Sequence, residues 1–303
     1  MPSGTTSRLD PGGRMTQSKN VVGVTGKRVL AIYAHPDDEG QVTGTLAAFL
    51  AAGNAVTLIC TTRGEVGEIS DAALATPETL GYTRELELRA AMAQIGLADV
   101  RFLPFWDSGM DGTPENADPR CFHQQPADVA VPAILSIMRE VRPHFVFTWQ
   151  ADGGYGHPDH IAAHRHTVAA FEACGDATAY PEAGEPWAPE RLYWGARLMG
   201  QFATIRLEME RRGLLPEPLD DAARTRIADM LAKPELPVSV IVDCAHLVET
   251  KRRASSMHRS QFGESSMFAR IPEDLRLQFF GQERFYQARP ETSDSEPPRT
   301  DFS

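Results

Sequence analysis

Apolar runs alternate with segments of helical character along the first half of the chain. Runs rich in Val, Ile, Leu and Phe predict strands at residues 27–34, 55–61, 100–103 and 143–149. Helices are expected between and after them, at residues 40–52, 83–96, 127–141 and 160–173. Strands that alternate with helices favour a parallel sheet with right-handed crossovers, so we predict an α/β fold.

The pattern is looser after residue 179. Strands are expected at 191–195 and 238–242, and helices at 220–231 and 244–258. We predict a Rossmann-like, largely parallel sheet flanked by helices, with this half as a C-terminal α/β extension that covers the site. Residues 23–287 form one domain in this interpretation. The segments 1–22 and 288–303 are rich in Pro, Gly, Ser, Thr or acidic residues and are expected to be disordered.

Composition excludes several classes of function. The chain has 303 residues, 42% of them hydrophobic and 23% charged, which is typical of a globular protein. Its formal net charge of −11 argues against nucleic acid and anionic membranes, because both require a basic surface. No apolar run approaches the roughly 20 residues of a membrane span. Four scattered cysteines without a CxxC pair favour free thiols and a cytoplasmic location. We expect a small-molecule partner and leave the oligomeric state open.

Two clusters of histidines and carboxylates follow the first and the fourth predicted strands. They are the HPDDE sequence at 35–39 and the HPDH sequence at 157–160. Because ligands bind beyond the carboxyl ends of parallel strands, we expect both clusters at one edge of the sheet. Two His and one carboxylate leave a fourth position open, as in catalytic zinc sites, and this set also suits Fe²⁺. The chemistry indicated is metal-assisted hydrolysis.

Each cluster also has a simpler interpretation. The acids at 37–39 could be capping residues at a helix N-terminus, where the helix dipole favours negative charge. The histidines at 157 and 160 could be incidental members of a Gly-rich surface loop. Two HPD tripeptides, each after a predicted strand, favour the metal site over both alternatives.

The chain resembles the PIG-L/LmbE-like family of metal-dependent de-N-acetylases, which act on N-acetylglucosamine conjugates. The resemblance covers roughly residues 27–171 and lies in AHPDDE before a helix, TRGE after the second strand and GHPDH after the fourth. GYTREL around residue 84 and WDSGM at 106–110 are similar especially to the mycothiol-pathway branch. That branch contains N-acetylglucosaminyl-inositol deacetylases and mycothiol S-conjugate amidases.

The resemblance implies that His35, Asp38 and His160 ligate the metal, which we expect to be Zn²⁺ or, as a second possibility, Fe²⁺. It implies that Asp37 is the general base and later the general acid. This role also follows from the residues, because neighbouring side chains point apart and Asp37 cannot easily ligate when Asp38 does. Asp37 is then free to accept a proton from water and pass it to the leaving amine.

Three further catalytic residues are implied by the resemblance. His157, held by Asp159, would stabilise the oxyanion. From the chemistry alone, a cationic imidazole at this position could neutralise the negative charge of the tetrahedral intermediate. Tyr155 would be a mobile residue over the site that touches the tetrahedral intermediate. Losing one oxyanion donor typically costs a factor of about 10²–10³ in rate.

Substrate contacts are implied for Arg84, Asp107 and Glu65, which would bind sugar hydroxyls or the aglycone. An Arg fork and a carboxylate suit vicinal hydroxyls as donor and acceptor. The simpler alternatives are that Arg84 is a surface charge on a helix and that Glu65 is a solvent-facing acid in a loop.

The sequence therefore predicts a zinc-dependent hydrolase that removes the acetyl group from an N-acetylglucosaminyl conjugate linked to inositol or a hydroxy acid. A mycothiol-type S-conjugate amidase is an alternative that would need a roomier acyl pocket. A non-catalytic sugar-binding or regulatory protein with a vestigial metal site is an alternative of another class. The intact Asp37 argues against the last, because binding alone needs no base.

Overall fold

A seven-stranded sheet with the order β5-β4-β3-β6-β7-β9-β8 organises the molecule. The computed structural model describes residues 7–9, 15–17, 20–196, 198–215, 217–263, 266, 270–292 and 296–303. The sheet consists of β3 (Arg28–Tyr33), β4 (Ala55–Cys60), β5 (Val100–Phe102), β6 (Phe145–Thr148), β7 (Arg191–Gly195), β8 (Val240–Asp243) and β9 (Gln282–Arg289). The first five of these strands run parallel to one another, whereas β9 is antiparallel to both β7 and β8. The predicted α/β, largely parallel sheet is confirmed.

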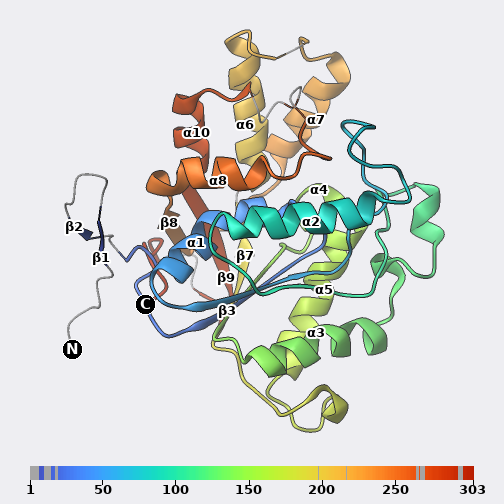
Figure 1. Cartoon of the computed structure of the whole chain (residues 1–303), viewed down its shortest axis with the longest axis vertical. Coiled ribbons are helices and arrows are strands. Elements are labelled where there is room, and N and C mark those ends of the chain that lie inside the picture. Colours follow the sequence, from blue (N-terminus) through green and yellow to red (C-terminus); the bar gives the residue numbers. More distant parts are fainter. Residues whose placement is uncertain are drawn as a thin grey trace.

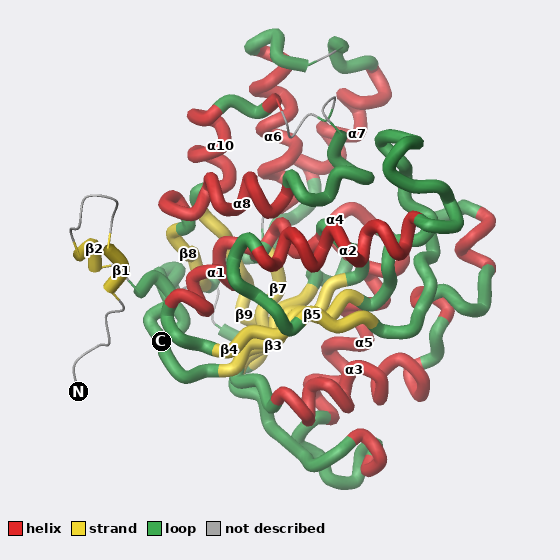
Figure 2. The backbone as a smooth tube through the Cα atoms, in the orientation of Figure 1, coloured by secondary structure: helices red, strands yellow, loops and turns green. Residues whose placement is uncertain are grey.

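Helices cover both faces of the sheet (Figure 1, Figure 2). On one face lie α1 (Thr43–Ala51), α2 (Leu80–Ala93) and α8 (Val248–Ser255), and on the other α3 (Ala127–Val141) and α5 (Pro158–Ala173). Beyond α8, a further layer contains α6 (Leu198–Arg211), α7 (Asp221–Ala232) and α10 (Glu273–Phe280). None of the helices in the described ranges is long and apolar enough to span a bilayer.

The remaining elements are short. They are the strands β1 (Ser7–Leu9) and β2 (Met15–Gln17), the helix α4 (Gly153–Gly156), and the 3₁₀ helices η1 (Asp38–Gln41), η2 (Pro114–Ala117), η3 (Phe122–Gln124), η4 (Pro181–Ala183) and η5 (Ala245–Leu247). The predicted helix at 40–52 is thus divided into η1 and α1, with Val42 between them. This division leaves the acidic residues of the HPDDE sequence in a turn and at the start of a 3₁₀ helix.

Among the longer described elements, α6, α10 and β9 were not predicted. The strand β9 reads QERFYQAR, and its burial alternates because Glu283, Phe285 and Gln287 face inward. Buried polar residues at two of these three positions hide the apolar alternation that identifies a strand in sequence. The segment joins β7 to β8 and so connects the C-terminal extension to the sheet.

The described part of the C-terminal tail contacts the core through Phe302, while most of residues 296–303 are exposed. Phe302 is only 1% exposed, and its ring lies 5.0–6.1 Å from those of Phe49, Phe145 and Phe285. Residues 293–295 lie outside the described residues, as do 1–6, 10–14 and 18–19 of the predicted N-terminal segment. Within that segment, β1 pairs with β2, and Val22 belongs to the core.

Candidate active site

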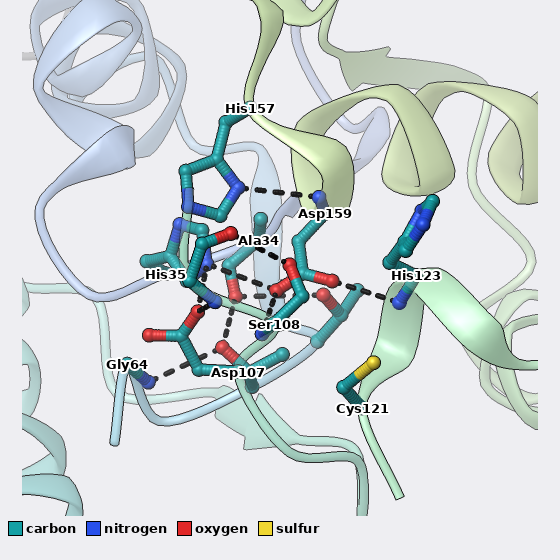
Figure 3. A network of polar contacts seen from close by, with 12 residues as sticks. Ala34, His35, Gly64, Asp107, Ser108, Cys121, His123, His157 and Asp159 are labelled. Carbon is teal, nitrogen blue, oxygen red and sulfur yellow. Dashed lines mark hydrogen bonds and ion pairs between the residues drawn. The ribbon is translucent and has the colours of Figure 1, made fainter. Parts of the chain in front are cut away.

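Loops at the carboxyl edge of the parallel strands converge on His35 (Figure 3). The turn after β3 carries the HPDDE residues, the loop after β5 carries Asp107 and Ser108, and the start of α5 carries the HPDH residues. Parallel strands bring their C-terminal ends to one edge, which is why the two distant motifs meet. The prediction that both clusters lie at this edge is confirmed.

Three potential ligand atoms face one another in this cluster. The Nδ1 atom of His35 lies 3.1 Å from Nε2 of His160 and 3.7 Å from Oδ2 of Asp38. Nε2 of His160 lies 3.3 Å from Oδ1 of Asp38. Both histidines are almost fully buried. Two imidazole nitrogens and one carboxylate at this spacing fit a three-ligand metal site with an open position.

The second nitrogen of each histidine is engaged elsewhere. Nε2 of His35 lies 3.3 Å from carboxylate oxygens of both Asp107 and Asp159, and Nδ1 of His160 lies 3.0 Å from the carbonyl oxygen of Gly153. Such contacts commonly orient histidines that ligate metals. Burial lowers the pKa of His35, but Asp107, Asp159 and Asp38 raise it well above its ordinary value. This excess of buried negative charge is a physical reason for the site to attract a cation.

Other groupings of potential ligands share His35. Its ring also lies near His157, and the set of His35, Asp107 and Asp159 has ligand atoms within 4.8 Å of one another. The two carboxylates of this last set already accept backbone N–H groups. Asp107 accepts from Gly109 at 2.9 Å, and Asp159 accepts from Ser108 at 2.8 Å. Both oxygens of each of these two acids accept a backbone N–H, so a metal there would compete with the donors. Asp38 accepts backbone N–H groups through Oδ2 and presents Oδ1 to His160, which favours the side of His35 that faces Asp38.

Asp159 does not hold His157 through its carboxylate, and in this respect the sequence prediction is wrong. The Asp159 oxygens contact His35 and accept the N–H groups of Ser108 and His123 (Figure 3). Instead, the backbone N–H of Asp159 donates to Nδ1 of His157 at 3.2 Å. His157 is the N-cap of α5, so its ring accepts one of the free amides at the start of that helix.

This backbone contact determines which nitrogen of His157 carries the proton. Nδ1 is the acceptor, so the neutral ring presents an Nε2–H. Burial, together with the neighbouring His35 and His160, lowers the pKa of His157 to about 2. These surroundings therefore favour a neutral imidazole as the donor, and the role of His157 toward an oxyanion stays a prediction.

Asp37 adopts a strained backbone conformation beside the ligand cluster. Its φ is 110°, in the left-handed region that residues other than Gly rarely occupy. One carboxylate oxygen lies 3.3 Å from Nη2 of Arg84. Burial raises the pKa of Asp37 to about 6, with Arg84 opposing and Asp38 adding to the rise. A carboxylate with this pKa can accept a proton near neutral pH and give it back.

Arg84 is buried and is not the surface charge of the simpler interpretation. The residue is 4% exposed, and its guanidinium donates to the carbonyl oxygens of Pro36 at 2.6 Å and Gly64 at 3.0 Å. A Cβ at Gly64 would come within 2.2 Å of Nη1, and its φ of +67° also favours glycine. Arg84 thus ties the TRGE loop to the turn that carries Asp37. Its Nε has no hydrogen-bond partner among the described residues.

Asp107 and Glu65 are enclosed between loops. Glu65 is 8% exposed, and Oε2 accepts the N–H of Asp107 at 3.1 Å, so it is not a solvent-facing acid. Burial raises the pKa of Glu65. Asp107 is 3% exposed and contacts His35 and loop amides. Sugar contacts by Arg84, Asp107 and Glu65 stay predictions, since each already has internal partners that account for its placement.

Tyr155 lies at the open side of the cluster, in agreement with its expected position. It is 43% exposed, and its ring centre lies 5.0 Å from that of His160 and 6.2 Å from that of His157. Burial of its hydroxyl, together with nearby carboxylates, raises its pKa well above the ordinary value. The hydroxyl therefore keeps its proton and can donate a hydrogen bond.

Sequence analysis gave no role to Trp149 or to Glu39. Trp149 stacks on His160 with ring centres 4.0 Å apart and fixes the plane of that imidazole. Glu39 is 2% exposed and contacts both the backbone of Asp37 and His258. In the sequence, the position of Trp149 directly after β6 and that of Glu39 within the HPDDE sequence were the signals that could have pointed to these roles.

Comparison with known proteins agrees with this geometry. Residues 30–171 match the family PIG-L, described as GlcNAc-PI de-N-acetylase. A 1D-myo-inositol 2-acetamido-2-deoxy-alpha-D-glucopyranoside deacetylase from Rhodococcus erythropolis is 41% identical over 251 residues, which are 78% of this chain and 82% of the relative. A protein of the same name from Rhodococcus jostii is 36% identical over 279 residues, covering 87% and 92% of the two chains.

A solved structure shares the fold. It is the N,N'-diacetylchitobiose deacetylase from Pyrococcus horikoshii, with a TM-score of 0.57, 18% identity, and coverage of 86% of this chain and 83% of that one. The family is metal-dependent, and the buried His and Asp groups of this chain can hold a metal ion. The chain therefore belongs to the PIG-L family of de-N-acetylases and is an enzyme that acts on an amide bond.

Proposed function

We propose that this chain is a zinc-dependent deacetylase of an N-acetylglucosaminyl conjugate, with inositol as the aglycone. The observation that carries the proposal is the convergence of His35, Asp38 and His160 next to a carboxylate whose pKa is about 6. The names of the Rhodococcus relatives support the sugar and the inositol. All four cysteines are free, which supports a reducing, cytoplasmic environment.

His35, Asp38 and His160 would hold the metal. Bound there, a divalent ion polarises the acetyl carbonyl and lowers the pKa of a water molecule. Burial and the outer contacts of both histidines keep the ligand atoms pointed at one position. Asp38 accepts the N–H of His35 at 2.8 Å, and despite its burial its pKa is lowered by His160 and His35. It is therefore anionic and ready to ligate.

Asp37 would accept the proton of the attacking water and return it to the leaving amine. Its contact with Arg84 keeps the carboxylate from being fully protonated, and its burial keeps it basic. His157 would donate its Nε2–H to the negative oxygen that develops as the amide carbon becomes tetrahedral. Tyr155, whose ring lies beside those of His160 and His157, would donate its hydroxyl proton to the same oxygen after a rotation of the side chain.

The experiment is an amine-release assay on the purified protein, loaded with Zn²⁺ or Fe²⁺ in parallel. N-acetylglucosaminyl-inositol should be hydrolysed with a higher kcat/KM than free N-acetylglucosamine, because binding of the aglycone helps to orient the acetamide. A substrate with a bulky acyl group in place of acetyl should react more slowly. Equal rates for the acetyl substrate and the bulky substrate would show that the enzyme is an amidase of broader acyl specificity and not a dedicated deacetylase.

Metal content of variants tests the ligand set. His160→Ala should lose the metal, whereas His157→Ala should retain about one ion per chain and lose rate by a factor of roughly 10²–10³. If His157→Ala loses the metal and Asp38→Ala keeps it, the third ligand is His157. If neither His35→Ala nor His160→Ala loses it, the proposed centre is wrong.

A further inference from the structure

A buried ion pair connects the catalytic turn to the C-terminal half of the chain. Nε2 of His258, just beyond the end of α8, lies 2.7 Å from Oε1 of Glu39. The two residues are 219 positions apart, and their exposed fractions are 1% and 2%. Burial lowers the pKa of His258, but the Glu39 carboxylate raises it above the ordinary value. The pair is therefore a charged contact in the interior.

The other oxygen of Glu39 reaches the backbone of Asp37. The N–H of Asp37 donates to Oε2 of Glu39 at 2.9 Å. Asp37 has a φ of 110°, a conformation that is strained in a residue other than Gly. A strained residue keeps its conformation only where surrounding contacts fix it. The hydrogen bond from the Asp37 N–H to Glu39 is one such contact, made at the strained residue itself.

We propose that His258 is a positioning residue for the reaction, acting through Glu39 on the backbone of Asp37. His258 fixes the Glu39 carboxylate, and Glu39 fixes the left-handed turn that presents the Asp37 side chain next to the ligand cluster. The inference rests on the proposed role of Asp37 as general base. It gives the C-terminal half of the chain a part in catalysis without contact to substrate.

A second buried ion pair from α8 provides a comparison. Nζ of Lys251 lies 2.6 Å from Oε1 of Glu283, and Glu283 accepts the N–H groups of Gly44 at 2.9 Å and Thr45 at 2.7 Å. This pair caps the start of α1 and makes no contact with Asp37 among the described residues. Breaking either pair leaves a buried carboxylate unpaired and destabilises the fold. Only the His258 pair should also change catalysis.

The test compares His258→Asn with His258→Gln, two amides that differ by one methylene. The Gln amide reaches the position of Nε2 and can donate to Glu39, whereas the shorter Asn amide cannot. His258→Asn should lower kcat by roughly 10–100-fold, the usual effect of losing an outer-shell partner, with KM changed by less than about twofold. His258→Gln should remain within about threefold of the parent. Metal content should be unchanged in both.

Lys251→Met is the matched control, measured in the same assay on the metal-loaded protein. It should lower the unfolding midpoint but leave kcat within about twofold of the parent. Three outcomes would overturn the positioning role. His258→Asn could leave kcat unchanged, or His258→Gln could be as impaired as His258→Asn. The third is a loss of kcat in Lys251→Met as large as that in His258→Asn. Loss of the metal from His258→Asn overturns it as well.

Two further variants complete the design. If His258→Asn does not fold, Glu39→Gln replaces it, because the amide keeps an acceptor for Asp37 but loses the charged contact with His258. A drop in kcat of about tenfold supports the proposal, and an unchanged kcat overturns it. Asp37→Asn separates the two hypotheses. If it is active, Asp37 is not the base, and both the proposed mechanism and the positioning role that rests on it fail. If it is inactive while His258→Asn is normal, only the positioning role fails.

Discussion

The carboxylate of Asp107 lies 3.3 Å from Nε2 of His35, on a ring whose Nδ1 faces His160 at 3.1 Å. A carboxylate at the second nitrogen of a ligating histidine fixes the ring and raises its basicity. His35 carries such a contact from both Asp107 and Asp159. These two acids therefore support the metal centre from the side opposite to the ligand cluster.

Asp107→Asn should weaken metal binding. The amide lacks the negative charge that raises the pKa of His35, and it can present an N–H to the ring instead of an acceptor. We expect metal affinity to fall by roughly 10–100-fold. Competition with a chelator of known affinity measures it, with exposed Asp111→Asn as the control. Unchanged affinity with a raised KM for the sugar conjugate would show that Asp107 binds substrate, as the sequence suggested.

Asp37→Asn should retain the metal and lose most activity, because an amide of nearly the same shape cannot accept a proton. A loss of roughly 10²–10⁴-fold in kcat is expected for removing a general base. The measurement pairs steady-state kinetics with metal analysis of the same preparation. Near-normal turnover in a metal-loaded sample would eliminate Asp37 as the base.

Arg139 should be one of the larger single contributors to stability. It is 2% exposed, and its five N–H groups lie within hydrogen-bond distance of six backbone carbonyls between Ala173 and Gly184. Arg139→Met leaves these carbonyls without their donor, and we expect a loss of about 3–5 kcal/mol in the free energy of unfolding. Urea denaturation measures it. As a control, Arg226→Met, at an exposed position, should change the free energy of unfolding by less than about 0.5 kcal/mol. Equal effects of Arg139→Met and Arg226→Met would contradict this account.

His166 should make the protein less stable in mild acid. Burial, and then the neighbouring Arg165, lowers the pKa of this histidine from 6.5 to about 4. Because the folded pKa lies below the unfolded one, the stabilisation is complete above pH 6.5 and is lost as the pH falls toward 4. Between pH 7 and pH 5 the loss should be at most about 2 kcal/mol.

His166→Leu isolates this contribution. The variant has no titrating group at position 166, so its free energy of unfolding should fall less between pH 7 and pH 5 than that of the parent. Urea denaturation of both proteins at the two pH values gives the comparison, and other titrating groups cancel in the difference. Parallel pH dependences would show that His166 does not titrate in this range.

The sequence by itself determined the parallel sheet and the meeting of the two motifs. Apolar runs such as 27–34 and 143–149 have few alternatives to burial, and parallel strands necessarily place their C-terminal ends at one edge. The residues that follow those strands, His35 to Glu39 and His157 to His160, were therefore brought together by topology alone. The same reasoning identified Asp37 as the spare carboxylate.

Only the tertiary structure decided which polar groups contact one another. Asp159 lies two residues from His157, yet its carboxylate contacts His35, because the start of α5 turns it toward the loop of Ser108. Similarly, Phe302 follows a polar tail but fills a space between aromatic rings of the core. Local pattern predicts the type of an element, whereas side-chain partners distant in sequence depend on how the elements pack.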